Sequence, residues 1–263
     1  MRSLIFKHSV LGLIHSLILL LILGQPLSAK AGESVAELVW VENSDSSHAL
    51  YLARYQNNTW HKSAAPIYTS DNAITAPALG TDKNGMRLLI WTEQRNNKFV
   101  LMMSVRNKVS LQSAWSNAQQ FSDFGIENFS ATMVRDITGV LWVFWSASIG
   151  GLSDIYVSKQ TNVGWSKPSK INDNNKVPDS HPEARLNEEG NIAVSWSSYN
   201  IQSNTYERVH KEINREFDAV AIAELADKTL ESDIPIPSFL PSSSIATLHF
   251  PNNKSQQSIR VGQ

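Results

Sequence analysis

A tryptophan that recurs every 51 to 54 residues constrains the fold of this chain more than any other feature of the sequence. Trp91, Trp145 and Trp196 each lie six residues after a glycine, and each glycine lies three residues after an Asp or Asn. Trp40, 51 residues before Trp91, extends the series towards the N-terminus. Such a period indicates one supersecondary unit repeated along the chain, with neighbouring units stacked to bury a common core.

Each unit has the pattern of an antiparallel sheet. The Asp/Asn-x-x-Gly stretch between two apolar runs predicts a β-hairpin, because glycine supplies the positive φ that a tight turn requires. The run after the turn is apolar on both faces, which is typical of a strand buried between packed sheets. These second strands are expected over 86–91, 140–145 and 192–196. Third strands are expected over 49–55, 99–105 and 154–158, and fourth strands at Trp60, Trp115 and Trp165.

Four strands in about 50 residues with a recurrent Trp are typical of a β-propeller. We label the strands of one unit A to D and predict an all-β fold, a small β-propeller of about four four-stranded blades over 32–224. The recurrent tryptophans are expected in the core, and Trp142, outside their register, is expected to face another sheet. Hydrophobic residues make up 42% of the chain, which is enough to fill such a core.

The N-terminus has the order of a secretory signal peptide. Arg2 and Lys7 precede an apolar run over 9–24, and Ala29-Lys30-Ala31 follows it. We therefore predict a signal peptide over 1–31, export to the periplasm or the extracellular space, and no membrane span after cleavage. An uncleaved anchor is the alternative, although the run is shorter than the span of about 20 residues that a bilayer requires. The chain has no cysteine, which excludes a lipoprotein anchor, disulfides and thiolate metal sites.

The C-terminal part is expected to complete the first blade. Residues 225–244 contain three prolines and a serine run, and are predicted to be a linker. The segment 245–263 begins with an apolar stretch, 245–250, that resembles a degraded first hairpin strand. The first blade has no A strand of its own, and sheet edges need to be covered. We therefore predict that 245–250 pairs with 38–41; completion by a second molecule or a free tail are the alternatives.

The repeats resemble those of the sialidase-like superfamily of β-propellers, which carry BNR or Asp-box repeats. The matching residues are Ile155–Ser158, Gly164–Pro168 and Ser180–Ala184, followed by Gly190 and Trp196, and the resemblance spans about 35–215. It implies a propeller that acts on or binds glycans. The turns before the D-strand tryptophans lack the Asp and Gly of the Asp-box, and the Arg-Ile-Pro motif of true sialidases is absent.

The sequence contains no recognisable catalytic set. Arginines share no common position in the repeats, so we assign no triad that would hold a substrate carboxylate. The seven arginines considered are Arg54, Arg87, Arg95, Arg106, Arg135, Arg185 and Arg208. Histidines at zinc-site spacing, a nucleophile elbow and a phosphate loop are all absent, so we expect no metal and no cofactor. The net charge of −1 and the scattered Lys and Arg argue against binding to nucleic acid.

Topology indicates where a binding site would lie. The D–A and B–C loops of a propeller emerge at the same end, and loops carry function more often than strands do. The candidate ligand-binding residues in these loops are Asp71, Asn72, Arg95, Glu127, Asn128, Asp179 and His181. We predict an exported, noncatalytic propeller that binds a glycan or an envelope protein with these residues. Ordinary solvated loop polarity, or a sialidase-like glycoside hydrolase with an unrecognised active site, are the alternatives.

Overall fold

The computed structural model describes residues 36–44, 46–106, 114–213, 234–241, 245–250 and 256–260. The predicted signal peptide and much of the predicted linker lie outside these residues. Every regular element in the described part is a β-strand. Within that part there is accordingly no helix long and apolar enough to cross a membrane.

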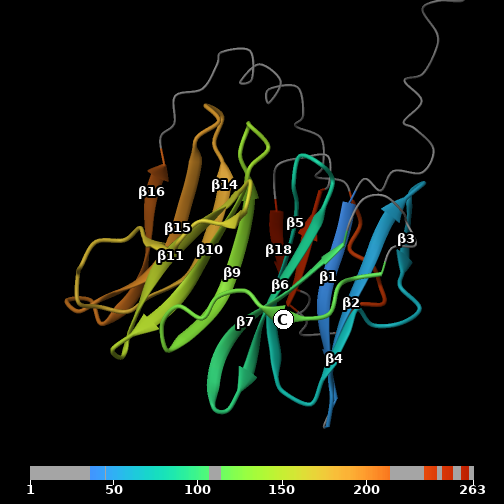
Figure 1. Cartoon of the computed structure of the whole chain (residues 1–263), viewed down its shortest axis with the longest axis horizontal. Coiled ribbons are helices and arrows are strands. Elements are labelled where there is room, and N and C mark those ends of the chain that lie inside the picture. The colour runs from blue at the N-terminus through green and yellow to red at the C-terminus, as the bar shows by residue number, and fades with distance from the viewer. Residues whose placement is uncertain are drawn as a thin grey trace, which may run out of the picture. The chain divides into compact units, whose positions relative to one another are not determined.

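The described residues form four antiparallel sheets that follow one another along the chain (Figure 1). Sheet 1 has the order β18 (Gln256–Arg260), β17 (Ile245–His249), β1 (Ala36–Asn43), β2 (His48–Gln56), β3 (Thr59–Lys62), with β4 (Tyr68–Ser70) also on β2. Sheet 2 contains β5 (Ile74–Thr81), β6 (Arg87–Arg95), β7 (Lys98–Arg106) and β8 (Gln119–Gln120). Sheet 3 contains β9 (Glu127–Arg135), β10 (Leu141–Ile149), β11 (Leu152–Thr161), β12 (Gly164–Trp165) and β13 (Ser169–Lys170). Sheet 4 contains β14 (Asp179–Leu186), β15 (Ile192–Asn200) and β16 (Thr205–Ile213). This is a β-propeller, so the predicted fold class is confirmed.

The predicted hairpin turns between the A and B strands are present in sheets 2, 3 and 4. Gly85, Gly139 and Gly190 have φ of 79°, 85° and 79°. The side chains of Asp82 and Asp136 each accept two backbone N–H groups of their own turn. The carboxylate therefore replaces backbone acceptors that the turn lacks, which explains why Asp or Asn begins the motif.

Hydrophobic clusters between consecutive sheets hold the propeller together. Trp91, Trp145 and Trp196 are at most 3% exposed, and each packs towards the preceding sheet. Trp142 packs in the opposite direction, against sheet 4, as predicted. Each interior sheet is consequently buried on both faces, and this accounts for strands that are apolar throughout.

A β-bulge recurs in every A strand of sheets 2 to 4. Ala76, Ser130 and His181 occupy the same repeat position, have φ of 47°, 53° and 55°, and coincide with register shifts against the B strand. The freed N–H of Ser130 donates to Thr92 Oγ1 at 3.0 Å, and that of His181 donates to Ser146 Oγ at 3.1 Å. The bulges of sheets 3 and 4 thus link each of these sheets to the one before it.

The predicted D strands are less regular than expected. Trp60 and Trp165 lie in β3 and β12, but the prediction for Trp115 is wrong, because this residue lies outside any strand. The hydroxyl of Ser116 accepts the N–H of Val105 at 3.0 Å, and Ser166 has the same contact with Lys159 in sheet 3. In sheet 2, strand pairing beyond Trp115 is resumed at β8.

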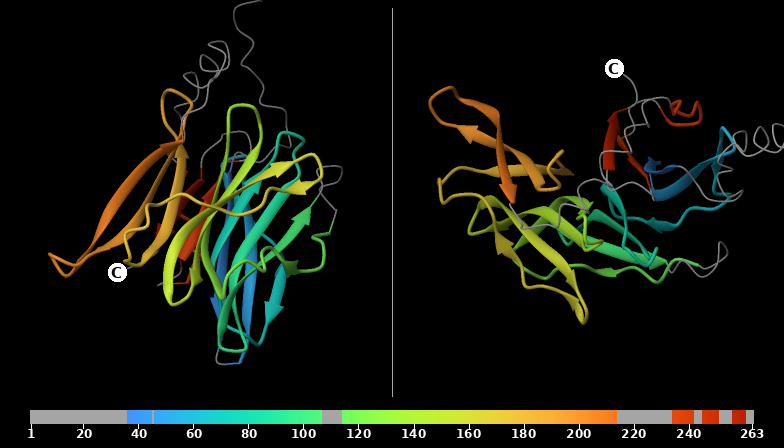
Figure 2. Two further views of the ribbon diagram at one scale, coloured as in Figure 1. Left: turned by 60° about the vertical axis from the view of Figure 1, so that its left-hand side comes forward. Right: turned by 90° about the horizontal axis from the view of Figure 1, so that it is seen from above.

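The C-terminal residues complete sheet 1. β17 pairs antiparallel with β1, with Leu38 opposite Leu248, as the predicted pairing requires. β18 pairs with the edge of β17 that faces away from β1 (Figure 2). β17 therefore serves as the A strand of sheet 1, β1 remains its B strand, and β18 is an additional edge strand. Ala246, Leu248 and Phe250 are at most 5% exposed.

Different surfaces terminate the stack of sheets at its two ends. On sheet 1, Phe239 and Leu240 pack on Trp40, so this part of the predicted linker belongs to the core. On sheet 4, the free face carries Ser195 at the position of Ile90 in sheet 2 and Phe144 in sheet 3. A polar outer face is typical of the terminal unit of a repeat protein.

Candidate functional site

Asn72 and Arg95, two of the predicted site residues, meet at the buried carboxylate of Glu93. Arg95 Nε donates to Glu93 at 2.9 Å and Asn72 Nδ2 at 3.3 Å. Three further donors, Tyr68, Ser70 and Trp91, lie within 3.2 Å of the same carboxylate. Burial would raise the pKa of Glu93, but these hydrogen bonds, Arg95 first among them, hold the pKa below its usual range. The group is therefore a fixed anion that positions the loop, while the half-exposed guanidinium of Arg95 faces solvent.

Asn128 and Asp179 accept hydrogen bonds from the indole N–H groups of buried tryptophans. Trp145 Nε1 donates to Asn128 at 2.8 Å, and Trp196 Nε1 donates to Asp179 at 3.0 Å. Both acceptors lie 17 residues before their tryptophan, and both are at most 2% exposed. They share one repeat position, two residues before the bulge, whereas Asp71 lies elsewhere in its loop and is exposed. In sheets 1 and 2 a glutamate two residues after the tryptophan, Glu42 or Glu93, takes this role.

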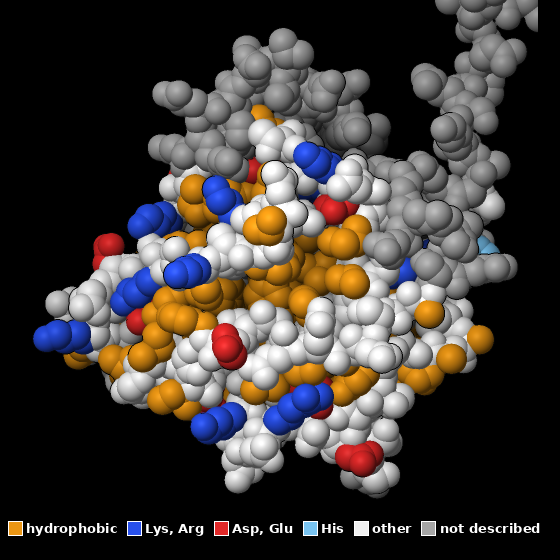
Figure 3. Space-filling view, in the orientation of Figure 1, with side chains coloured by type: hydrophobic (Ala, Val, Ile, Leu, Met, Phe, Trp, Pro, Cys, Tyr) orange, Lys and Arg blue, Asp and Glu red, His pale blue; other side chains and the backbone are white. Residues whose placement is uncertain are grey.

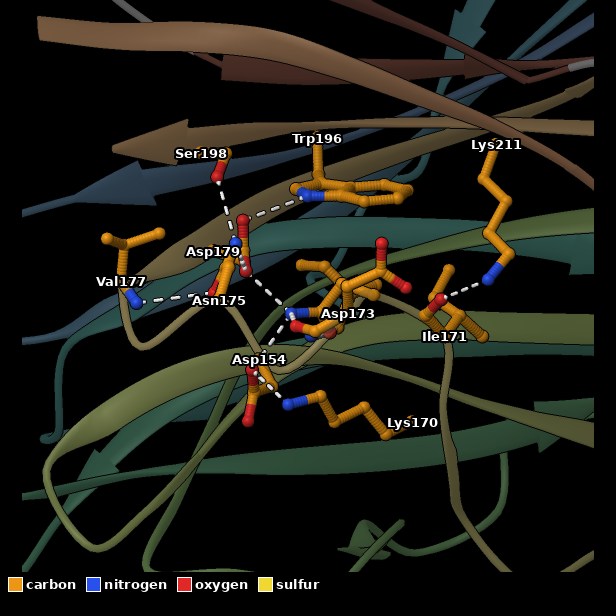
Figure 4. Close-up of polar contacts among 12 residues, drawn as sticks. Asp154, Lys170, Ile171, Asp173, Asn175, Val177, Asp179, Trp196, Ser198 and Lys211 are labelled. Carbon is orange, nitrogen blue, oxygen red and sulfur yellow. Dashed lines mark hydrogen bonds and ion pairs between the residues drawn. The ribbon is translucent and has the colours of Figure 1, made fainter. Parts of the chain in front are cut away.

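Asp179 is the centre of a polar network at the B–C end of sheets 3 and 4 (Figure 4). Besides Trp196, its carboxylate accepts from Asn172 at 2.6 Å and Asn175 at 3.1 Å. Asn172 also donates to Asp154 at 2.8 Å, and Lys170 pairs with Asp154 at 2.9 Å. These contacts hold the loop before β14 in place. In the described part of the chain, no group of three His, Cys, Asp or Glu residues is arranged to hold a metal ion.

A row of aromatic side chains crosses sheets 2 to 4 at this same end. The ring centroids of Phe99 and Phe129 are 6.1 Å apart, and those of Phe129 and His181 are 6.5 Å apart. Phe99 is 40% exposed, Phe129 is half-buried and His181 is exposed. Glu127 begins the strand that carries Phe129 and is half-buried. Of the three residues in this row, only His181 was predicted as a site residue from the sequence. Phe99 and Phe129 lie near the starts of β7 and β9, directly beside the predicted loops, and their position next to these loops could have indicated them.

A second polar cluster, at the opposite A–B end of sheets 1 and 2, was not predicted. Glu37 is fully buried and lies 3.1 Å from Arg54 Nε, 2.7 Å from Arg87 Nε and 3.5 Å from Arg106 Nη2. No arginine cluster was predicted from the sequence, because these arginines share no repeat position. Glu37 is directly opposite Arg54 in sheet 1, Arg87 is opposite Arg106 in sheet 2, and packing of the two sheets unites the pairs.

His249 lies beside this cluster and is buried without a complete set of partners. Its Nε2 is 2.7 Å from Thr81 Oγ1, and its Nδ1 contacts no donor or acceptor among the described residues. Burial lowers the pKa of His249 to about 4; Glu37 opposes this effect, and the charges of Arg87 and Arg135 add to it. His249 is therefore neutral in the folded protein at pH 7.

We expect the stability of the protein to depend on His249 below neutral pH. Because the folded-state pKa of about 4 is below the unfolded value of 6.5, the unfolded chain binds more protons, and stability is lost as the pH falls from 6.5 to 4. The loss at this site is up to about 3 kcal/mol. Urea denaturation of wild type and His249→Gln at pH 7 and pH 4.5 measures it. A difference between the two proteins that is the same at both pH values would contradict the prediction.

Sheet 4, together with Thr132 of β9, lines a hollow of about 730 Å³. Charged side chains from β14 and β16 surround it. Arg208 Nη2 lies 3.0 Å from Glu183 and also donates to Ser195. Arg208 further donates to the carbonyl of His181 at 3.3 Å. The hollow is thus a polar surface in which Arg208 and Glu183 form an ion pair.

Comparison with known proteins finds distant similarity to solved structures and no relative in sequence. No protein-family model and no curated protein matches the sequence. An endo-arabinase from Bacteroides thetaiotaomicron is similar in structure, with 15% identity, a TM-score of 0.40 and coverage of 67% of this chain and 74% of the enzyme. A thermostable family-43 glycoside hydrolase has 14% identity, a TM-score of 0.42 and coverage of 89% and 91%. The NanB sialidase from Streptococcus pneumoniae has 14% identity, a TM-score of 0.43 and coverage of 66% of this chain and 28% of the sialidase. At these values the likeness carries no argument about activity.

Proposed function

We propose that the chain is an exported, noncatalytic β-propeller that binds a glycan at the B–C end of sheets 2 to 4. The observation that carries this proposal is the row formed by Phe99, Phe129 and His181. Exposed aromatic rings offer flat apolar surfaces on which the C–H faces of sugar rings stack. Glu127, two residues before Phe129 in β9, is a polar group suited to binding hydroxyls. An aromatic surface with few polar groups is typical of small-molecule and saccharide sites.

The separation of the charged clusters supports a noncatalytic role. A sialidase-like mechanism requires clustered arginines and a Tyr–Glu pair on one face. Here the hydrogen-bonded pair Tyr68–Glu93 lies at the B–C end, whereas Arg87 and its neighbouring arginines lie at the A–B end. Arg87 and Glu93 are six residues apart in β6, which corresponds to about 20 Å in a strand. The arginines also hold a carboxylate of the protein itself, Glu37.

The surface charge is consistent with a neutral or weakly charged ligand. Figure 3 shows Lys and Arg side chains dispersed around a hydrophobic middle on the face drawn there, without a continuous basic stripe. Export rests on the pattern of residues 1–31 in the sequence, and places the site where envelope or extracellular glycans are available.

A glycan array probed with the full chain, followed by calorimetry on the best ligand, tests the proposal. We expect Phe99→Ala and Phe129→Ala to weaken binding at least 10-fold, which corresponds to about 1.4 kcal/mol. Tyr206→Ala is the matched control, because Tyr206 is 58% exposed on sheet 4 outside the row and its removal leaves the row intact. Absence of glycan binding, or equal binding by both phenylalanine variants, would refute the proposal. Release of reducing sugar from a bound glycan would instead favour the glycoside hydrolase.

A further inference from the structure

We infer that Arg54, Arg87 and Arg106 form a binding site for an oxyanion at the A–B end of sheets 1 and 2. This inference is independent of the proposed glycan site, which lies at the other end of the strands. It rests on three observations: an excess of positive charge, unused donors, and limited access from solvent.

The charge of the cluster is unbalanced. Three guanidinium groups lie within 3.5 Å of a single carboxylate, that of Glu37. Arg135 is also nearby, but it donates to the backbone carbonyl of Asp82 at 3.2 Å. Burial lowers the pKa of Arg106 to about 10, and the positive charge of Arg54 lowers it further than Glu37 can restore. Partly buried charges without a partner are costly, and an anion would offset that cost.

Some donors of the cluster have no acceptor among the described residues. Arg54 and Arg87 each donate to Glu37 through Nε, so the terminal nitrogens of both side chains remain. Within the part of the chain that the structure describes, these terminal nitrogens contact no acceptor. The guanidinium of Arg106 lies over the ring of Trp115, 5.0 Å from the ring centroid, in a cation–π contact.

Access to the cluster is restricted but present. The side chains of Arg54, Arg87 and Arg106 are 19%, 16% and 8% exposed. The three side chains therefore keep some contact with solvent, and their partly buried setting strengthens charged hydrogen bonds. The planar guanidinium group presents pairs of N–H donors whose spacing matches two oxygens of a carboxylate, phosphate or sulfate. The ligand class is thus an oxyanion with at least two oxygens available.

Thermal unfolding and calorimetry of the full chain test the site. The sodium salts of phosphate, sulfate, acetate and glucuronate are each compared with sodium chloride at equal ionic strength. We expect at least one oxyanion to raise the unfolding temperature above the chloride value, because a ligand that binds only the folded state stabilises it. Preference for phosphate and sulfate would identify a tetrahedral anion. Preference for acetate and glucuronate would identify a carboxylate.

Variants separate this site from a purely structural ion network. Arg54→Gln is expected to weaken oxyanion binding at least 10-fold, and Arg54→Lys is expected to weaken it less because the charge remains. Arg185→Gln, an exposed arginine of sheet 4, is the control and should bind as wild type does. A structural network would instead make Arg54→Gln equally unstable with and without the anion. No oxyanion effect beyond chloride, or an unchanged effect in Arg54→Gln and Arg106→Gln, would overturn the inference.

Discussion

A chain that ends at Pro241 is expected to lose the folded state and to aggregate. The truncation removes β17, and with it the buried side chains of Ala246, Leu248 and Phe250. It also removes the hydrogen bond from Thr247 Oγ1 to the carbonyl of Pro77, 2.6 Å long, which ties the hairpin to sheet 2. β1 would then present an unpaired edge of backbone N–H and C=O groups, and such edges pair with other chains.

Light scattering and thermal unfolding of the truncated chain measure this effect. We expect oligomers or aggregates, and no cooperative transition near the wild-type temperature. A control that lacks only 261–263 keeps β18 and should behave as wild type does. A truncated chain that is monomeric and as stable as wild type would show that β1 does not need its C-terminal partner.

Trp145→Ala is expected to lower the free energy of unfolding by about 3–5 kcal/mol, the range for removal of a large buried aromatic side chain. Trp145 is fully buried between sheets 2 and 3, where Phe121 and Tyr156 contact its ring. Its removal leaves a cavity and also deprives Asn128 Oδ1 of its donor, and an unsatisfied buried acceptor adds to the cost.

Two further variants separate the contributions to the loss at Trp145. Trp145→Phe retains most of the apolar contact and loses the indole N–H, so we expect a smaller loss, of about 1–2 kcal/mol. Val163→Ala serves as the exposed control, because Val163 is 98% exposed. Urea denaturation gives each value. A loss below about 1 kcal/mol in Trp145→Ala would mean that the contacts around this residue contribute little.

Much of the fold was predictable because it is repeated locally. The position of each second strand follows from an Asp/Asn-x-x-Gly turn and the tryptophan six residues later, and both are visible within ten residues. The pairing of 245–250 with 38–41 followed from the same reasoning, since the repeat lacks one strand at its start. The bulge was not predictable, because Ala76, Ser130 and His181 have no common side chain and the backbone alone shows the shared φ.

The polar clusters depend on contacts between distant segments, and local pattern does not encode these. Glu37 and Arg87 are 50 residues apart and meet only because sheet 1 packs on sheet 2. Arg54 could have been placed opposite Glu37 once the strand register was known, but the sequence does not state that register. In the same way, Asn128 and Asp179 were predicted as ligand-binding loop residues, and the structure reveals the buried indole N–H group that each of them accepts. Whether Asp71, Glu127 and the other predicted site residues bind a ligand stays a prediction.

The polar face of sheet 4 has a consequence for how this architecture can change by duplication. An extra unit appended after β16 would meet Ser195 and the charged side chains around it, at the position where sheets 2 and 3 present Ile90 and Phe144. A unit inserted between sheets 2 and 3 would instead meet Ile90 on one side and Trp145 on the other, and both are apolar. The number of repeats is therefore free to grow within the stack but not at its end. For the same reason, head-to-tail polymers of this chain are disfavoured at the face of sheet 4.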